Sequence, residues 1–215
     1  TKADGSAIGK VTLNSSGGAI SSVGNARVDA DDLTAKAAKG ISINHSALGN
    51  MAKLNIEATT GDVSIDSDRG KLQFVGGDKK GALNGNLVIN AADDITTANG
   101  TVLNGKRIDF TSLGAINAAI APGQELTSSD TMSASVNANA YGDITLTNSN
   151  GDMRIGHIAS QTGDVSLKTS GSFIDAVGDS TLSDSESKLQ KWQELGLINS
   201  NDRAEESTES AAAAK

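Results

Sequence analysis

Residues 142–147 read Gly-Asp-Ile-Thr-Leu-Thr, and residues 163–168 read Gly-Asp-Val-Ser-Leu-Lys. In both stretches a turn-forming Gly-Asp pair precedes an alternation of apolar and polar residues. Because successive side chains of a β-strand point to opposite faces, this alternation places two apolar side chains on one face and polar ones on the other. The two Gly-Asp pairs are 21 positions apart, which is about one coil of a β-solenoid. The stretches therefore predict short strands that recur once per coil.

The same alternation recurs along most of the chain. Helices need apolar positions three and four apart, which these runs lack, and turn-forming residues bound each run. Gly-Asp also occurs at Gly61 and Gly151, and the 81 positions from Gly61 to Gly142 are close to four coils. We expect an all-β parallel β-helix of about eight or nine coils over residues 5–180, in a segment spanning 1–182. The runs begin at Val11, Ile41, Leu54, Val63, Leu72, Leu87, Ile108, Ile144, Met153 and Val165.

The composition favours a narrow interior. The chain has 215 residues with 24 Gly, 1 Pro and no Cys, and aromatic residues make up only 2% of it. A wide core normally uses aromatic rings, since each ring buries a large area. An interior filled by small aliphatic side chains is typical of a solenoid, in which each coil covers the next.

Charge and cysteine content exclude several classes of partner and site. The formal net charge of −8 makes nucleic acid an unsuitable partner, because binding phosphates requires a basic surface. The absence of Cys excludes a disulfide scaffold and any Cys-ligated metal site. No apolar run reaches the ~18 to 20 residues of a membrane-spanning helix, so we expect no membrane-spanning segment. The chain opens in mid-pattern, and we expect it to be a piece of a longer protein.

Two stretches interrupt the predicted coils. Residues 118–135 contain the only proline, Pro122, and a Ser/Thr-rich run, which predicts a protruding loop. Ser183 and Glu186 form a capping-box pattern ahead of apolar residues at helical spacing, which predicts a short C-terminal amphipathic α-helix over 183–198. Residues 199–215, acidic and Ala-rich, are either a tail or the start of a further helix.

The residues that could carry chemistry form no recognisable catalytic or metal motif. We expect His45 and His157 to lie on the solvated coil surface, since neither has a second ligand at metal spacing. Isolated Gly-Asp pairs are typical of turns, whereas a calcium-binding β-roll needs tandem glycine-rich nonapeptides. No Gly-x-Ser-x-Gly elbow is present. We expect no cofactor. Asn44, Asn55, Asn90 and Asn148 lie at or near strand ends, where amides could stack or cap turns.

An enzyme acting on glycans is the weakest of the open alternatives. Parallel β-helices host such enzymes, and glycoside hydrolysis needs two carboxylates across one cleft. The coils offer almost no aromatic platform for a sugar, and Tyr141 is the only tyrosine. We therefore expect the chain not to be an enzyme. The acids predicted to face outward are Asp62, Asp66, Asp143, Asp152 and Asp164.

The stretches 142–147 and 163–176 resemble the repeats of filamentous haemagglutinin-like adhesins, very large proteins exported by two-partner (type Vb) secretion. Residues 188–198, Lys-Leu-Gln-Lys-Trp-Gln-Glu-Leu-Gly-Leu-Ile, together with the acidic tail, further resemble the leukotoxin-type filamentous adhesins of anaerobic Gram-negative bacteria. The resemblance implies a right-handed β-helix, secretion through an outer-membrane transporter to the bacterial surface, host-cell attachment and toxicity to leukocytes. The family supplies no catalytic residues, and its N-terminal secretion domain is not apparent here.

Two principal functions remain open. The chain is either a host-binding or toxin module whose partner is a host-cell surface protein or glycan, or a purely structural spacer of the rod. Recognition is expected where the chain departs from the repeat, so Gln124, Glu125 and Trp192 are the candidate partner-binding residues. For Trp192 we favour packing of its helix against the last coil, and a partner-binding anchor is the alternative.

Overall fold

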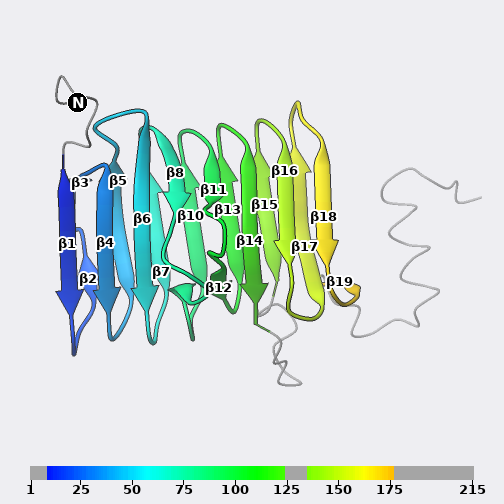
Figure 1. Cartoon of the computed structure of the whole chain (residues 1–215), viewed down its shortest axis with the longest axis horizontal. Coiled ribbons are helices and arrows are strands. Elements are labelled where there is room, and N and C mark those ends of the chain that lie inside the picture. The colour runs from blue at the N-terminus through cyan, green and yellow to red at the C-terminus, as the bar shows by residue number, and fades with distance from the viewer. Residues whose placement is uncertain (1–8, 124–134, 177–215) are drawn as a thin grey trace, which may run out of the picture. The chain divides into compact units, whose positions relative to one another are not determined.

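The computed structural model describes residues 9–123 and 135–176, and it contains no helix within them. The strands of these residues pair in parallel and belong to two sheets, between which the chain alternates (Figure 1). Sheet A comprises β1 (Lys10–Ser15), β4 (Asp32–Ala37), β6 (Met51–Ala58), β8 (Lys71–Phe74), β9 (Lys80–Ala82), β11 (Ile95–Thr97), β12 (Leu103–Gly105), β14 (Ile116–Pro122), β16 (Ile144–Asn148) and β18 (Val165–Thr169). Sheet B comprises β2 (Ile20–Ser21), β3 (Val28–Asp29), β5 (Ile41–Ser46), β7 (Val63–Ser67), β10 (Leu87–Ala91), β13 (Ile108–Ser112), β15 (Val136–Ala140), β17 (Met153–Ser160) and β19 (Phe173–Asp175).

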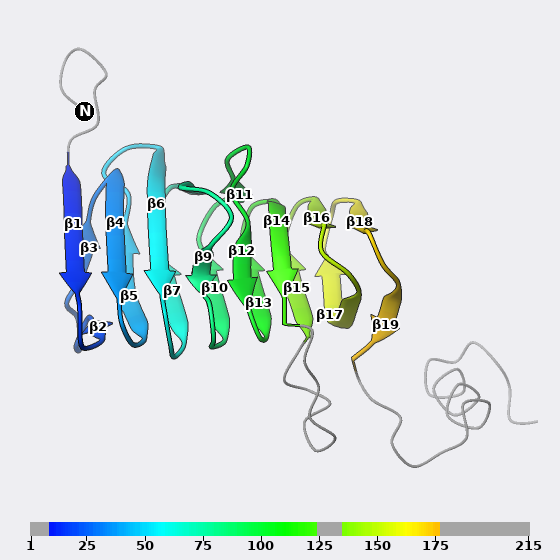
Figure 2. The ribbon, with the colours of Figure 1, turned by 60° about the horizontal axis from the view of Figure 1, so that its bottom comes forward.

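The two sheets contain eight rungs each, joined by about seven turns of the solenoid. Sheet A has ten strands on eight rungs because β8 and β9 both pair with β6, and β11 and β12 both pair with β14. In sheet B, β2 and β3 share a rung against β5. The chain between β11 and β12 leaves the sheet as a small loop (Figure 2).

The predicted all-β parallel solenoid is confirmed. Each of the ten alternating runs lies in a strand, and its apolar members face the interior in the central rungs. Ile144 and Leu146 are fully buried and stack on Ile116 and Ala118 of the preceding rung. Stacking of like positions removes apolar surface from water on both sides of each rung. The predicted helix over 183–198 and the tail over 199–215 lie outside the described residues.

The predicted coil length is correct for the pair that suggested it and wrong for another. Ile144 pairs with Val165, 21 positions later, so the two Gly-Asp turns at Gly142 and Gly163 are one coil apart. Gly61, in contrast, precedes β7 of sheet B, whereas Gly142 precedes β16 of sheet A. The 81 positions between them are therefore not a whole number of coils, because Gly-Asp occurs at both corners of the solenoid.

The loop predicted for residues 118–135 begins later than the sequence suggested. Strand β14 continues to Pro122, and Ala118 and Ile120 lie in the interior. Ile120 is paired with Leu103 on one side and with Asn148 on the other. Pro122 ends the strand, since it has no N–H for the ladder. Residues 124–134 lie outside the described residues.

Candidate functional site

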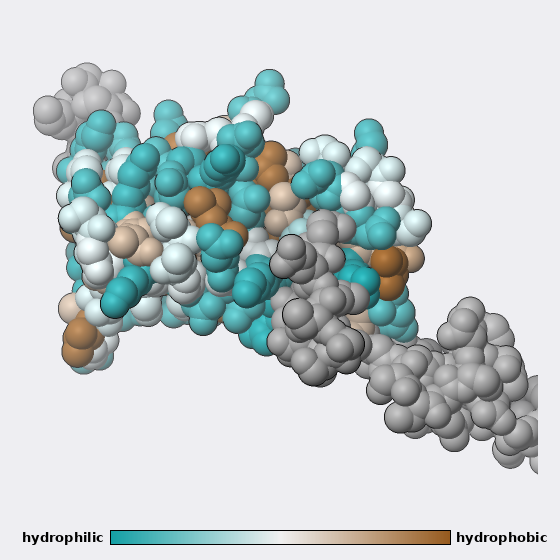
Figure 3. Space-filling model, turned by 90° about the horizontal axis from the view of Figure 1, so that it is seen from below, coloured by the Kyte–Doolittle hydropathy of each residue, from teal (hydrophilic) through white to brown (hydrophobic). Residues whose placement is uncertain are grey.

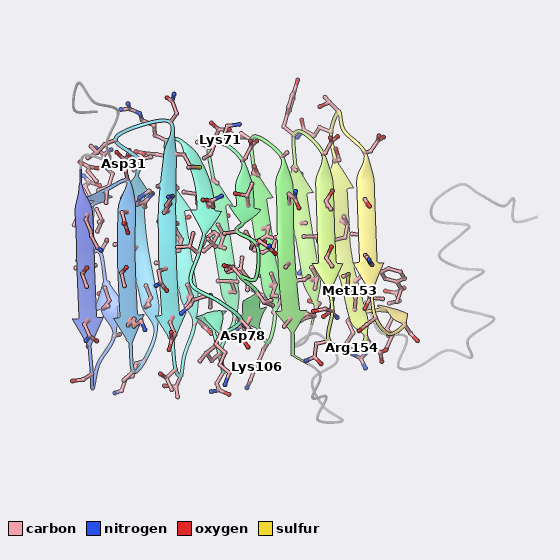
Figure 4. All side chains as sticks on the ribbon, in the orientation of Figure 1. Asp31, Lys71, Asp78, Lys106, Met153 and Arg154 are labelled. Carbon is pink, nitrogen blue, oxygen red and sulfur yellow. The ribbon has the colours of Figure 1, made fainter. Side chains whose placement is uncertain are left out.

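Carboxylates and amides at the corners join each rung to the next. The side chain at the start of one rung accepts a hydrogen bond from a backbone N–H one coil later: Asp143 Oδ1 accepts from Asp164 at 2.9 Å. Asp94 Oδ1 accepts the same kind of bond from the backbone N–H of Ala115 at 2.9 Å, and Asp94 Oδ2 accepts a hydrogen bond from Lys71 Nζ at 2.6 Å. Lys71 lies at the start of β8 (Figure 4). Three further side chains accept the same bond from a backbone N–H one coil later: Asp62 from Asn86, Asn86 from Arg107, and Asp152 from Ser172. We call these bonds corner staples.

The corner staples explain the aspartates of three of the four Gly-Asp pairs, Asp62, Asp143 and Asp152, without a metal. A carboxylate that accepts a hydrogen bond from a backbone N–H gives that N–H the acceptor that the turn itself does not supply. Among the described residues, no group of three or more His, Cys, Asp or Glu side chains is placed to hold a metal ion. The geometry favours turn chemistry over calcium binding for Asp62, Asp143 and Asp152.

His45 is buried, and the prediction of a solvated surface position is wrong for it. Its side chain has 0% exposure. Nε2 lies 2.9 Å from the carbonyl oxygen of Ala30, and Nδ1 lies 3.1 Å from Ser67 Oγ. Because a carbonyl only accepts, Nε2 carries the proton and Nδ1 accepts from the hydroxyl. Burial lowers the pKa of His45, so the neutral ring holds residue 30 against sheet B. His157, in contrast, is exposed as predicted.

A second polar cluster lies on sheet A. Lys80 is only 6% exposed, and its Nζ lies 2.9 Å from Glu57 Oε2. Lys36, which is half-exposed, lies 3.6 Å from the same oxygen. The hydrogen bond from Lys80 is the main cause that holds the pKa of Glu57 below its usual value. The carboxylate is thereby committed to neutralising a buried ammonium group, which is a structural role.

A groove of about 550 Å³ lies over the outer face of sheet B. Its floor is a column of polar side chains on successive rungs, since Asn44 pairs with Asp66, Asp66 with Asn90, and Asn90 with Thr111. Neighbouring rungs of a sheet are ~4.8 Å apart. Asn90 Nδ2 donates to Asp66 Oδ1 at 2.6 Å, which fixes both side chains. We call this feature the sheet B groove.

Residues 24–27 form one wall of the sheet B groove. Asn44 Nδ2 donates to the carbonyl oxygens of Gly24 and Ala26 at 3.4 and 3.1 Å. The Arg27 guanidinium lies 2.6 Å from Asp29 and 3.0 Å from Asp68. These contacts hold the wall over the floor before any ligand arrives.

Of the two carboxylates that line the sheet B groove, Asp68 has a pKa shifted in the direction opposite to that of a general acid. The other carboxylate is Asp66, and a general acid needs a raised pKa. The hydrogen bond from the Ser46 hydroxyl is the main cause that lowers the pKa of Asp68, and the hydrogen bond from Arg27 lowers it further. The other acids that the sequence suggested are not gathered here. Asp62, Asp143 and Asp152 make corner staples, and Asp164 is exposed beside β18.

The predicted partner-binding residues Gln124, Glu125 and Trp192 lie outside the described residues. The sequence analysis missed the sheet B groove, although two signals were available. Period-two alternation from Ile41 through Ile43 places His45 on the inner face and Asn44 on the outer one. The one-coil spacing from Asn44 to Asp66 and on to Asn90 is the second signal.

No family model, curated protein or solved structure matches the chain significantly. The class of protein is therefore defined by its fold: the chain is a parallel β-solenoid. The corner staples and the sheet B groove are the features of this solenoid that bear on its function. Within the residues that the structure describes, no helix is long and apolar enough to cross a membrane.

Proposed function

We propose that the chain is a segment of a large secreted filamentous adhesin, in which the solenoid is a stiff rod that carries host-recognition sites. The parallel ladders, which continue from rung to rung in both sheets, support this proposal most directly. Each rung satisfies the backbone groups of the previous rung and presents equivalent groups to the next, so the same geometry extends over any number of coils. The outer surface seen in Figure 3 is largely hydrophilic, as a rod in water requires.

The finer parts of the proposal rest on the sequence resemblance. They are a right-handed coil, export through an outer-membrane transporter, location at the bacterial surface, and attachment to host cells with toxicity to leukocytes. Right-handed crossovers between parallel strands are also the general rule in proteins. We propose that the segment is not catalytic. The commitment of most outward aspartates to corner staples or ion pairs supports this view.

Binding of the purified chain to leukocytes and epithelial cells tests the proposal. Two variants locate the recognition site: replacement of residues 124–134 by a short Gly/Ser linker, and Trp192→Ala. Circular dichroism establishes that each variant retains the parent β-sheet signal. Loss of cell binding in a folded variant assigns recognition to the altered segment. A parent chain that binds neither cell type would contradict the adhesin proposal and favour a structural spacer.

A further inference from the structure

The sheet B groove offers more hydrogen-bond acceptors than the protein itself uses. Asn90 donates to one oxygen of Asp66, and in the described part of the chain no donor reaches the other. The amide oxygens of Asn44 and Asn90 also lack partners there, since both residues use only their NH₂ groups. Three acceptors thus lie in one column at the spacing of successive rungs.

From this arrangement we propose that the sheet B groove binds an uncharged glycan, whose hydroxyl groups donate to Asp66, Asn44 and Asn90. A carboxylate flanked by amides is suited to hydroxyls because it accepts from two neighbouring O–H groups at once. The hydroxyl of Thr111, on the next rung, both donates and accepts, so the column continues for a ligand longer than one sugar ring. This inference rests on the proposed adhesin function and names the partner class at one site.

The charges of the groove argue against an acidic ligand. Among the residues that the structure describes, Arg27 is the only cationic side chain that lines the groove, and its guanidinium is held by Asp29 and Asp68. Asp66 adds a negative charge that no cation in the described residues offsets. A sialylated or phosphorylated ligand would meet this carboxylate without a free positive partner, so neutral glycans are preferred.

The shape of the groove supplies the remaining requirements. Leu113, 70% exposed, and the small residues Ala91 and Ala92 give an apolar edge for the C–H face of a sugar. The wall made by residues 24–27 is already fixed by Asn44 and Arg27, which reduces the ordering cost of binding. No Phe, Tyr or Trp among the described residues lines the groove, so we expect modest affinity for a single short glycan.

A basic peptide is the alternative occupant, and two features favour the glycan. Arg27 offsets one of the two charges of Asp29 and Asp68, so one of these and Asp66 stay uncompensated, but two of the three free acceptors are neutral amides, which add no charge to attract a cation. The Arg27 side chain already fills the position between Asp29 and Asp68 that a peptide cation would otherwise take. Ionic strength separates the two ligands, because salt screens a cation and leaves neutral hydroxyls nearly unaffected.

The test uses the full chain on an array of neutral oligosaccharides and their sialylated counterparts, followed by calorimetry of the best neutral glycan at low and high salt. Hexalysine is the cationic probe. Asp66→Ala and Asn90→Ala are each expected to weaken binding about tenfold, the usual effect of losing hydrogen bonds to a charged or fixed acceptor. Asp32→Ala is the matched control, since Asp32 is an outward acid on β4 of sheet A.

Binding of a neutral glycan that is insensitive to salt, weakened by both groove variants and unchanged in Asp32→Ala, supports the proposal. It is overturned if no neutral glycan binds, if both folded groove variants bind as the parent does, or if only hexalysine binds in a salt-dependent way. A parent that binds cells without binding glycans leaves the adhesin proposal standing and removes the groove assignment. A parent that binds glycans without binding cells supports the groove assignment and contradicts the adhesin proposal.

Discussion

The carboxylate of Asp143 accepts a hydrogen bond from the backbone N–H of Asp164, one coil further along the solenoid, at 2.9 Å. Both residues belong to Gly-Asp pairs, so the motif that marks a turn in the sequence also joins successive turns in space. We expect Asp143→Ala to lower the free energy of unfolding by about 1 kcal/mol, the cost of leaving a turn N–H without its acceptor. Asp143→Asn, which keeps an oxygen, should lose less in urea unfolding. Equal losses would show that charge, and not the hydrogen bond, is what matters.

Gly163 lies directly over the same aspartate. A Cβ there would overlap the side chain and backbone of Asp143 and the backbone of Gly142. We expect Gly163→Ala to destabilise the solenoid by roughly 1–3 kcal/mol, as overpacking does elsewhere. Gly17→Ala is the control, since nothing lies within 4 Å of a Cβ at Gly17. If thermal unfolding shifts equally in both variants, the close stacking at the corner is not real.

The strand register makes a sharp prediction for β16. Ile144 and Leu146 are fully buried, whereas Thr145 between them faces outward and is half-buried. Ile144→Asp should cost several kcal/mol and abolish cooperative unfolding, because it places an unpaired charge in the apolar stack. Thr145→Asp should change stability by less than about 1 kcal/mol. Similar damage from the two variants, measured by circular dichroism, would mean that the register is wrong.

His45 should make stability depend on pH. Its folded-state pKa is lowered by burial, so between that lowered value and about 6.5 the unfolded chain binds the proton more readily. The stabilisation is therefore fully present above about pH 6.5 and is lost as the pH falls through this window.

Urea unfolding at a series of pH values above about 5 isolates this effect, because the carboxylates titrate at lower pH. The parent should lose stability as the pH falls, and His45→Gln should show a flatter profile. A profile that is unchanged in His45→Gln would assign the pH dependence to other groups.

The Glu57 carboxylate should matter more through Lys80 than through Lys36. Glu57→Gln leaves the buried Lys80 ammonium without its counter-ion, and we expect a loss of about 2–4 kcal/mol. Lys36→Met removes only a half-exposed partner and should cost less than about 0.5 kcal/mol. In Lys80→Met, the further change Glu57→Gln should become nearly neutral. A full loss in that double variant would refute the coupling.

The candidate site was less predictable than the fold. The expectation that recognition lies where the chain departs from the repeat directed attention to Gln124, Glu125 and Trp192, all outside the described residues. The sheet B groove was not anticipated, because it is assembled from residues 24–27, β5, β7, β10 and β13. His45 was misassigned because a lone histidine in a polar stretch was judged by its neighbours in sequence and not by its position in the alternation.

The sequence by itself determined the strands and their inward faces, because period-two alternation is a local property that each short run carries in full. It also determined the length of the coil wherever Gly-Asp returned at the same corner. Only the tertiary structure decided which residues 20 to 24 positions apart would touch. Stacking brings Asp66 beside Asn90, Glu57 beside Lys80, and His45 beside Ser67. Coils of unequal length make these partners invisible to a fixed period, since one inserted residue changes which side chain meets which on every later rung.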